Sequence, residues 1–259
     1  MRSFLKCGAR WSQRSGILWM LAPLCLAILA GCSAPLRECP TLLSDESLRR
    51  ELIRSVADLY PAALQAAHRA TVTIAGKDYP LNGFVLTRQL RLDASRGDAR
   101  LVATSDLGGM AFDACQAAGG RPRVLRNAAG LRPSWITDGA LRDVVVIYLT
   151  RPGEGAALGR YSDGTLCLFE KMADESVREF LFAGDFHRLT AYCLFRREKC
   201  VYEVRFSSER TLGGWPRAFP TVLEIVDRKL GYHATVRVLQ LRPALLDDRS
   251  FERLPDDAK

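Results

Sequence analysis

The sequence predicts an α+β fold that is built on one large antiparallel sheet. Apolar residues recur at spacings of three and four over residues 44–60, which indicates an amphipathic helix. Apolar and polar residues alternate over residues 84–92 and 200–206, as they do in strands that bury only one face. The chain order is a helix, a run of meander strands, a second helix and more meander strands, which is typical of the α+β class.

The chain begins with the features of an export signal. Residues 1–14 carry four cations and no acidic residue, and residues 16–30 form an apolar run. This run is shorter than the roughly 20 residues that a membrane-spanning helix needs, and Pro23 interrupts it. Residues 1–31 are therefore predicted to be a signal peptide that is removed.

The apolar run ends in Leu29-Ala30-Gly31-Cys32, which resembles the lipobox of bacterial lipoproteins. The resemblance implies that Cys32 carries acyl chains such as palmitate, and each buried methylene of these chains contributes roughly 0.8 kcal/mol to membrane attachment. Ser33 stands where an aspartate would mark retention in the inner membrane, so we expect attachment to the outer membrane, facing the periplasm. The alternative is a secretory signal in which Cys32 is incidental.

After cleavage, residues 32–43 are predicted to form the acylated N-terminus and tether, and residues 44–259 a single domain. Ser44 is the expected N-cap of the first helix, and Pro61 is expected to break it, with residues 62–69 forming a second short helical piece. The apolar stripe of this helix is Leu48, Leu52, Val56, Leu59 and Tyr60.

The strands of the first half are predicted from alternation. Residues 84–92 place one apolar set on a single face, and turns at residues 95–98 and 106–109 separate this strand from those at residues 99–105 and 110–115. The apolar set of the first strand is Phe84, Leu86, Leu90 and Leu92.

A helical period returns over residues 133–149, with Ser134 as the expected N-cap. Its predicted buried stripe includes Trp135 and Leu141, and the β-branched run over residues 144–147 leaves its last turns open between helix and strand. Later strands are expected at residues 160–170, 179–183, 188–195, 200–207, 221–227 and 231–241. In the strand at 200–207, Tyr202, Val204 and Phe206 form the apolar row.

The net charge of +8 does not indicate a nucleic-acid partner. Removing the leader cations Arg2, Lys6, Arg10 and Arg14 lowers it to +4. The basic clusters at residues 121–126 and 196–199 fall in predicted turns and lack the interleaved aromatic residues of a single-strand binder. We therefore predict no nucleic-acid binding.

The mature chain has an odd number of cysteines besides Cys32, and export places them where disulfides persist. Cys193 and Cys200 flank a predicted hairpin and are candidates for a disulfide, although a different strand register would separate their thiols. A pair between Cys115 and Cys167 is a weaker alternative. The chain contains no CxxC motif, so neither a zinc ribbon nor a thioredoxin-like pair is supported.

The sequence offers no catalytic or metal-binding motif. It lacks GxSxG, HExxH and a dinucleotide fingerprint, and its three histidines, His68, His187 and His233, have no metal-ligand spacing. We expect no enzymatic activity, no cofactor and no metal. An anchored hydrolase would require His187 or His233 to lie beside an acidic residue and a hydroxyl in a cleft.

Several segments resemble the LolA/LolB superfamily of lipoprotein-localisation factors, and more closely the LolB-like lipoproteins. Residues 82–86 are similar to an early strand of that family, residues 104–113 to a turn and the following strand, and residues 133–143 to a lid helix. Residues 220–232 are similar to a late hairpin, and residues 251–255 to a common ending.

This resemblance implies an incomplete, strongly curved antiparallel β-barrel with helices covering its mouth. It also implies a cavity that binds an acyl chain, another lipophilic ligand or lipidated cargo, in lipoprotein or lipid trafficking. An alternative is an assembly lipoprotein that docks an envelope protein partner. The candidate cavity-lining residues are Phe84, Leu86, Phe112, Trp135, Leu141, Tyr202, Val204, Phe206 and Ile225.

Overall fold

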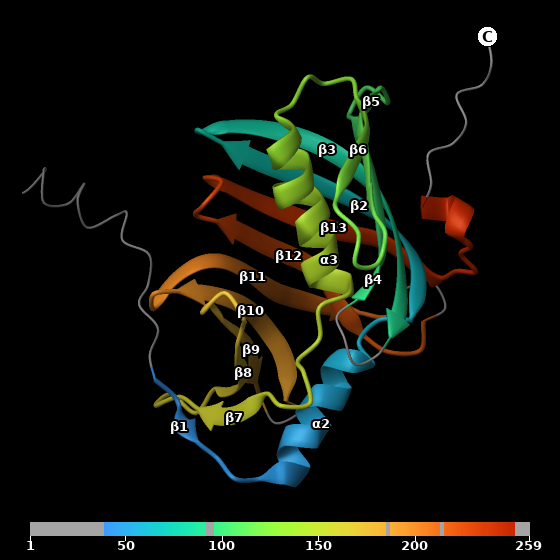
Figure 1. Cartoon of the computed structure of the whole chain (residues 1–259). Helices are drawn as coiled ribbons and strands as arrows, with labels where there is room; N and C mark the ends of the chain where they lie inside the picture. The colour runs from blue at the N-terminus through green and yellow to red at the C-terminus, as the bar shows by residue number, and fades with distance from the viewer. Residues whose placement is uncertain (1–38, 92–95, 185–186, 213–214, 252–259) are drawn as a thin grey trace, which may run out of the picture. The chain divides into compact units, whose positions relative to one another are not determined.

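One antiparallel sheet organises the part of the chain that the computed structural model describes, residues 39–91, 96–184, 187–212 and 215–251. These residues belong to one compact unit, Leu36–Lys259. Their 13 strands are ordered β1-β7-β8-β9-β10-β11-β12-β13-β2-β3-β4-β5-β6 (Figure 1). The strands are β1 (Thr41–Leu42), β2 (Ala63–Ile74), β3 (Lys77–Arg91), β4 (Arg96–Ser105), β5 (Met110–Gln116), β6 (Arg123–Asn127), β7 (Ala157–Arg160), β8 (Leu166–Lys171), β9 (Val177–Ala183), β10 (Arg188–Arg196), β11 (Lys199–Arg210), β12 (Phe219–Asp227) and β13 (Tyr232–Pro243).

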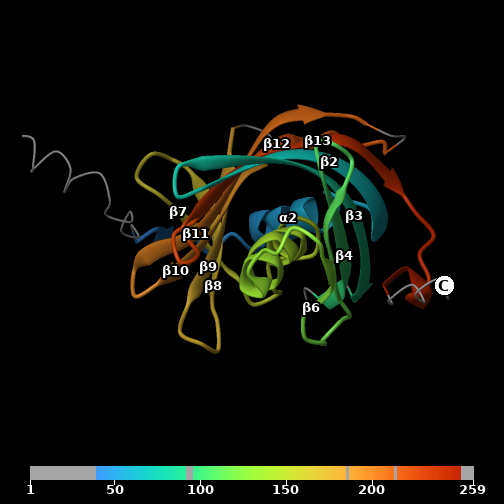
Figure 2. The same cartoon turned by 90° about the horizontal axis from the view of Figure 1, so that it is seen from above.

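The sheet curves around the helices and does not close, because β1 and β6 remain as its two edges (Figure 2). Strands β2 to β6 form one series of hairpins and β7 to β13 another. Strand β13 pairs with β2 and joins the two series, so that the last strand lies beside the first long one. This arrangement confirms the predicted α+β fold and the predicted incomplete barrel.

The first helix, α2 (Glu46–Ala57), has the predicted apolar face, with Leu52 and Val56 buried. Its N-cap is Asp45, whose side chain accepts a hydrogen bond from the Leu48 backbone N–H at 2.9 Å. The assignment of Ser44 as the N-cap was wrong by one residue. Both residue types can cap a helix, and here Asp45 has the extended backbone that the cap position requires.

Residues 62–69 do not form a second helical piece, because strand β2 runs through them. Leu64, Ala66 and His68 are buried, and the residues between them are not, which is a period of two. Strand β2 bonds with β13 on one side and β3 on the other. The hydrogen bonds of two neighbouring strands override the helix preference of this alanine-rich segment.

Strand β3 presents the opposite face from the one predicted. Val85 and Thr87 are fully buried on the concave side, whereas Phe84 is 39% exposed and Leu86 shares its convex face. Both faces of this strand contact protein, because the C-terminal segment packs on the convex side. Alternation alone therefore could not identify the inner face.

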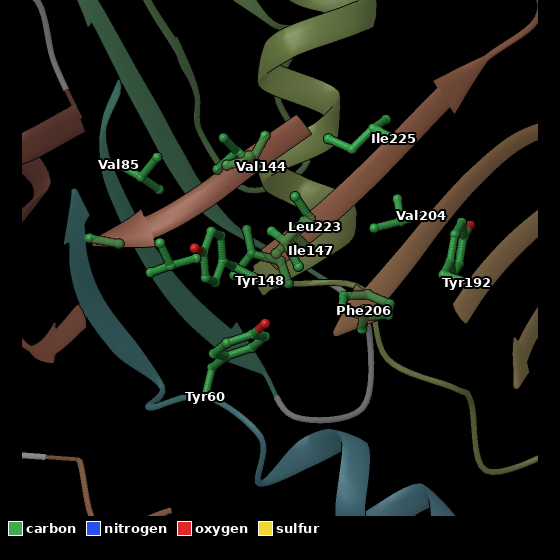
Figure 3. Close-up of a cluster of buried hydrophobic side chains, with 14 of the residues drawn as sticks. Tyr60, Val85, Val144, Ile147, Tyr148, Tyr192, Val204, Phe206, Leu223 and Ile225 are labelled. Atoms are coloured by element: carbon green, nitrogen blue, oxygen red, sulfur yellow. The ribbon is translucent and has the colours of Figure 1, made fainter. Parts of the chain in front are cut away.

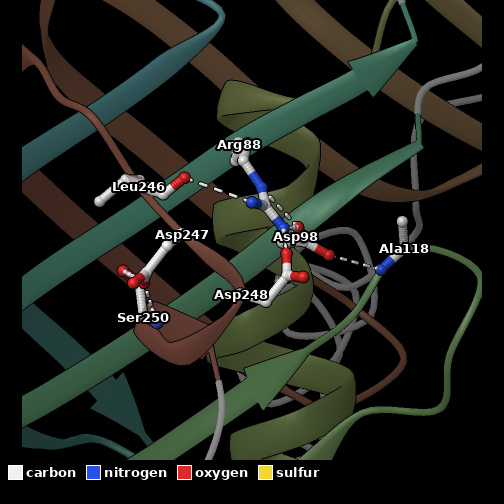
Figure 4. Close-up of polar contacts among 7 residues, drawn as sticks. All are labelled: Arg88, Asp98, Ala118, Leu246, Asp247, Asp248 and Ser250. Atoms are coloured by element: carbon white, nitrogen blue, oxygen red, sulfur yellow. Dashed lines mark hydrogen bonds and ion pairs between the residues drawn. The ribbon is translucent and has the colours of Figure 1, made fainter.

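The C-terminal segment is held to the convex face of β3 and β4 by ion pairs (Figure 4). Arg88 Nη2 lies 2.5 Å from Asp98 Oδ2 and 2.6 Å from Asp248 Oδ1, in the short 3-10 helix η2 (Asp248–Phe251). Arg100 donates to both oxygens of buried Asp113, at 3.1 and 2.7 Å, and to the Ser250 carbonyl at 3.1 Å. These contacts hold β3 and β4 in place from their convex face.

The predicted second helix is present on the concave side of the sheet (Figure 1). It begins with a π-helical stretch, η1 (Trp135–Leu141), and continues as α3 (Arg142–Tyr148), so the β-branched run is helical. Ser134 is the N-cap residue, as predicted, but its side chain makes no capping hydrogen bond. No helix in the described ranges combines the length and apolar character needed to cross a membrane.

Strand β6 was not predicted, because its residues were assigned to a basic turn. It is an edge strand that bonds only with β5 among the described strands. Its arginines Arg123 and Arg126 are exposed, and charged side chains are usual on edge strands, where they oppose pairing with another chain.

Large side chains fill the concave side of β8 to β12, among them Val204, Phe206 and Leu223 (Figure 3). Phe182 and Tyr202 are also fully buried there. Around the end of α3, Tyr60 packs edge-on against Tyr148, with ring centroids 4.8 Å apart, and lies 5.9 Å from Phe219. This half of the sheet is a packed core.

Candidate functional site

The continuous helix formed by η1 and α3 is called the lid helix below. An apolar cavity of about 180 Å³ lies between this helix and the concave face of the sheet, beside the packed core. Strands β2 to β5, β12 and β13 form its wall, and residues of η1 and α3 form its cover. Its apolar lining includes Ala70, Val72, Leu81, Leu101, Ala103, Phe112, Ile136, Val144, Ile225 and Ala234.

Small residues explain why this half is hollow. Gly83 on β3, Ala103 on β4 and Ala234 on β13 face the cavity, where the packed half of the sheet has aromatic side chains. Ala140 of the lid helix continues the pattern from the opposite side. Because these side chains are short, the lid and the sheet leave space between them.

The mouth of the cavity is marked by lining residues that solvent also reaches. Tyr79 is 42% exposed, Ala129 is exposed, and Trp135 is half-buried. The β4–β5 turn begins after Ser105, which pairs with the lining residue Leu81, and it presents Leu107, which is 98% exposed. An apolar ligand therefore has an apolar entrance.

A buried polar cluster closes the cavity beside α3. Asp143 accepts hydrogen bonds from Tyr202 Oη at 2.9 Å, from Tyr232 Oη at 2.6 Å and from Arg142 Nη2 at 3.0 Å. Arg142 Nη2 also lies 2.8 Å from Asp227 Oδ2, and its guanidinium stacks 4.0 Å from the centre of the Tyr202 ring. The cluster links the lid helix to β11, β12 and β13.

Burial raises the pKa of the Asp143 carboxyl, and the nearby Arg142 guanidinium opposes that shift. Burial also raises the pKa values of Tyr202 and Tyr232, and the Asp143 charge raises them further. Both phenols are therefore hydrogen-bond donors at neutral pH. Together with Arg142 they give the Asp143 carboxylate three hydrogen-bond donors, so the cluster holds the lid helix against the sheet.

His68 lies at the inner end of the cavity. Its Nε2 is 2.5 Å from Tyr148 Oη, and the two rings are stacked with centroids 5.7 Å apart. Burial lowers the pKa of His68 to about 4, so the ring is neutral at physiological pH. Sequence reasoning did not place His68 in the site, because residues 62–69 were assigned to a helix.

The predicted lining residues separate into three groups. Phe112, Trp135 and Ile225 lie in the cavity wall. Phe84 and Leu86 do not, since they are on the convex face of β3. The others, Leu141, Tyr202, Val204 and Phe206, are buried in the packed core beside the cavity and do not line it. Their strands were recognised, but side-chain size decides which part of the concave face is hollow.

Cys193 and Cys200 are thiols that contact each other on the convex face. A bulge in the pairing of β10 with β11 places Cys200 opposite Phe195 and Cys193 opposite Glu203. The hairpin was predicted correctly, and the disulfide stays a prediction. Cys115 and Cys167 lie on β5 and β8, which are far apart in the sheet order, so that alternative pairing is wrong.

The remaining histidines are outside the cavity. His187 Nδ1 lies 3.6 Å from Glu51 Oε1 at the surface, and His233 is exposed on β13. In the described ranges, no three His, Cys, Asp or Glu side chains are grouped so that they could hold a metal ion.

No protein-family model matches the chain, and no curated protein matches it in sequence. Solved structures do match. A DUF1329 family protein from Desulfovibrio piger aligns with 81% of this chain and 98% of its own, with a TM-score of 0.53 and 12% identity. A putative outer membrane lipoprotein-sorting protein domain from Vibrio parahaemolyticus aligns with 78% and 94%, with a TM-score of 0.51 and 8% identity.

A LolA superfamily protein from Nitrosomonas europaea aligns with 78% of this chain and 96% of its own, with a TM-score of 0.49 and 10% identity. The likeness to the first two structures shows that this chain shares their fold. Its open, curved antiparallel sheet with a helix on the concave side agrees with the fold that the resemblance to the LolA/LolB superfamily implies.

Proposed function

We propose that this protein is a membrane-anchored lipoprotein that holds the acyl chain of a lipid or of lipidated cargo in its cavity. The observation that carries the proposal is the apolar hollow between the lid helix and the alanine-rich half of the sheet. Burial of apolar surface is non-directional, at roughly 25 cal/mol per Å², and needs no catalytic residue. Binding, without chemistry, is the activity that this site supports best.

The size of the cavity limits how a chain is held. An engineered apolar cavity of about 150 Å³ accommodates one benzene molecule. The cavity here, at about 180 Å³, therefore takes the end of an acyl chain. Each enclosed methylene contributes roughly 0.8 kcal/mol. The rest of the chain would leave between Tyr79 and Trp135 and pass the exposed Leu107.

Attachment through Cys32 belongs to the same proposal. Cys32 lies outside the described residues, and the proposal that it is acylated is supported by the lipobox at the end of the apolar leader. Ser33 favours delivery to the outer membrane with the domain facing the periplasm. The name of the Vibrio parahaemolyticus neighbour, a lipoprotein-sorting domain, agrees with a role in lipoprotein or lipid trafficking.

The test is to fill the cavity. Ala103 is a buried wall residue, so Ala103→Phe should place a phenyl ring in the hollow at an overpacking cost of about 1–3 kcal/mol. Residues 36–259 contain the whole described core, and the fluorescence of N-phenyl-1-naphthylamine reports apolar binding to this unit. Ala103→Phe should abolish the fluorescence gain, and Val102→Phe, on the convex face of the same strand, should preserve it.

Equal binding by wild type and Ala103→Phe, with folding confirmed by circular dichroism, would refute the proposal. If the protein is instead an assembly lipoprotein, filling the cavity should not affect the capture of its partner. A stoichiometric envelope partner that is recovered equally with wild type and Ala103→Phe would favour docking over lipid holding.

A further inference from the structure

A pair of cysteines occupies a small apolar cluster on the convex face of the sheet, away from the cavity. The cluster consists of Ala191, Cys193, Phe195 and Cys200, with Val177 and Leu181 packed against it. The described parts of the chain contain no other cluster of this kind on that face of β9 to β11.

The bulge explains why the two thiols meet. Residues 191, 193 and 195 of β10 face the convex side, and Cys200 pairs with Phe195 on that side. The register shift between Leu194 and Phe195 then lets Tyr202 turn toward the concave core while Cys200 remains beside Cys193. The two side chains are diagonal neighbours on adjacent strands, and a hydrogen bond joins their thiols.

The surroundings of the two sulfurs differ in charge. Arg228 Nη1 lies 3.5 Å from Cys200 Sγ. Cys193 stands between two carboxylates in one cross-strand row, with Glu179 opposite on β9 and Glu203 opposite on β11. Glu203 acts on both thiols, so the difference between them comes from Glu179 beside Cys193 and Arg228 beside Cys200. A nearby cation stabilises a thiolate and nearby anions disfavour it, so the negative charge belongs on Cys200.

The hydrogen bond strengthens this asymmetry. Donation from Cys193 to Cys200 raises the pKa of Cys193 and lowers the pKa of Cys200. Burial raises the pKa values of both thiols, and only Cys200 has the adjacent Arg228, which lowers its pKa. Cys200 is therefore poised as the nucleophile, with Cys193 held protonated next to it.

We propose that Cys193 and Cys200 form a thiol pair with fixed roles, in which Cys200 attacks an oxidising disulfide and Cys193 resolves the product. The Cys200 thiolate attacks one sulfur of the oxidant, so that a mixed disulfide forms and one oxidant thiolate leaves. Cys193 then loses its proton and attacks Cys200 Sγ, which releases the second oxidant thiolate. The two protein thiols are oxidised to one disulfide, and the oxidant disulfide is reduced to two thiols, which take up the two protons.

The resulting disulfide would connect β10 and β11 next to their shared turn. Arg197 and Glu198 in this turn both have positive φ, at 47° and 65°. Both sulfurs are buried, so the oxidant reaches them when this end of the hairpin opens.

The test uses the mature full chain and oxidised glutathione, with mass spectrometry of the peptides that contain residues 193 and 200. In wild type, we expect a disulfide within this pair. Cys193→Ser should accumulate one glutathione on Cys200, and Cys200→Ser should leave Cys193 modified at least about tenfold more slowly, since one pKa unit changes the thiolate fraction tenfold. Arg228→Gln should slow the reaction of Cys200.

Two controls keep the test specific. Cys115→Ser removes a buried thiol on β5 that is remote from the pair, and it should change nothing. In concentrated urea the two single variants should react at similar rates, because the asymmetry comes from the folded surroundings. Absence of a Cys193–Cys200 disulfide in oxidised wild type, or faster reaction of Cys193 than of Cys200 in the folded single variants, would overturn the proposal.

Discussion

Acidification is expected to destabilise this protein through His68. Burial lowers the pKa of His68 from its ordinary value of 6.5 to about 4. Between these values the unfolded chain takes up a proton that the folded state does not, so the free energy of unfolding falls as the pH falls. One pKa unit corresponds to about 1.4 kcal/mol, which gives a loss of about 2 kcal/mol by pH 5 and about 3 kcal/mol by pH 4.

The assay is urea unfolding of residues 36–259 at pH 7 and pH 5, followed by circular dichroism. The informative variant is the double substitution His68→Leu and Tyr148→Phe, because it removes both partners of the buried hydrogen bond and leaves neither unpaired. The difference in unfolding free energy between the two pH values should shrink by about 2 kcal/mol in this variant.

His233 provides the matched control, since it is an exposed histidine on β13, a strand that pairs with β2. His233→Leu should leave the pH difference as it is in wild type. If the double variant kept the full pH dependence, the assignment of the acid sensitivity to a buried neutral His68 would be refuted.

Three further outcomes are expected. Asp143→Ala should lower the free energy of unfolding by about 3–5 kcal/mol, because it removes the carboxylate that accepts hydrogen bonds from Arg142, Tyr202 and Tyr232. Asp138→Ala, at the exposed surface of the same helix, is the control and should change the free energy of unfolding by less than about 0.5 kcal/mol. Arg100→Met should cost about 3–5 kcal/mol by stranding buried Asp113, and adding Asp113→Leu should recover most of that loss in the same unfolding assay. Cys32→Ala should abolish incorporation of radiolabelled palmitate in cells, and continued labelling of this variant would contradict the lipobox assignment.

The strands and the lid helix were predictable because their signals are local. The alternation in residues 200–206 and the helical period in residues 133–149 each depend on a few neighbouring side chains. Strand β2 was misassigned because alanine favours a helix in isolation, and only its two partner strands make it extended. No local pattern contains that information.

The sequence resemblance predicted that a cavity exists, but the sequence did not show where in the sheet it lies. Its position depends on small residues such as Gly83, Ala103 and Ala234, which come from separate strands and meet only in the folded sheet. The sequence-based choice favoured large apolar residues such as Val204 and Phe206, and these fill the neighbouring core instead. A search for short side chains at inward-facing positions would have been the better signal.

Strand β13 has a consequence for the order of events during synthesis. Strand β2 pairs with β3, which follows it directly in the chain, but its other neighbour, β13, ends at Pro243. Contacts between such distant segments form slowly, and this one cannot form before almost the entire polypeptide has left the ribosome. The sheet of the nascent chain therefore stays incomplete until synthesis is nearly finished, and an incomplete sheet is compatible with the export that we propose for this chain.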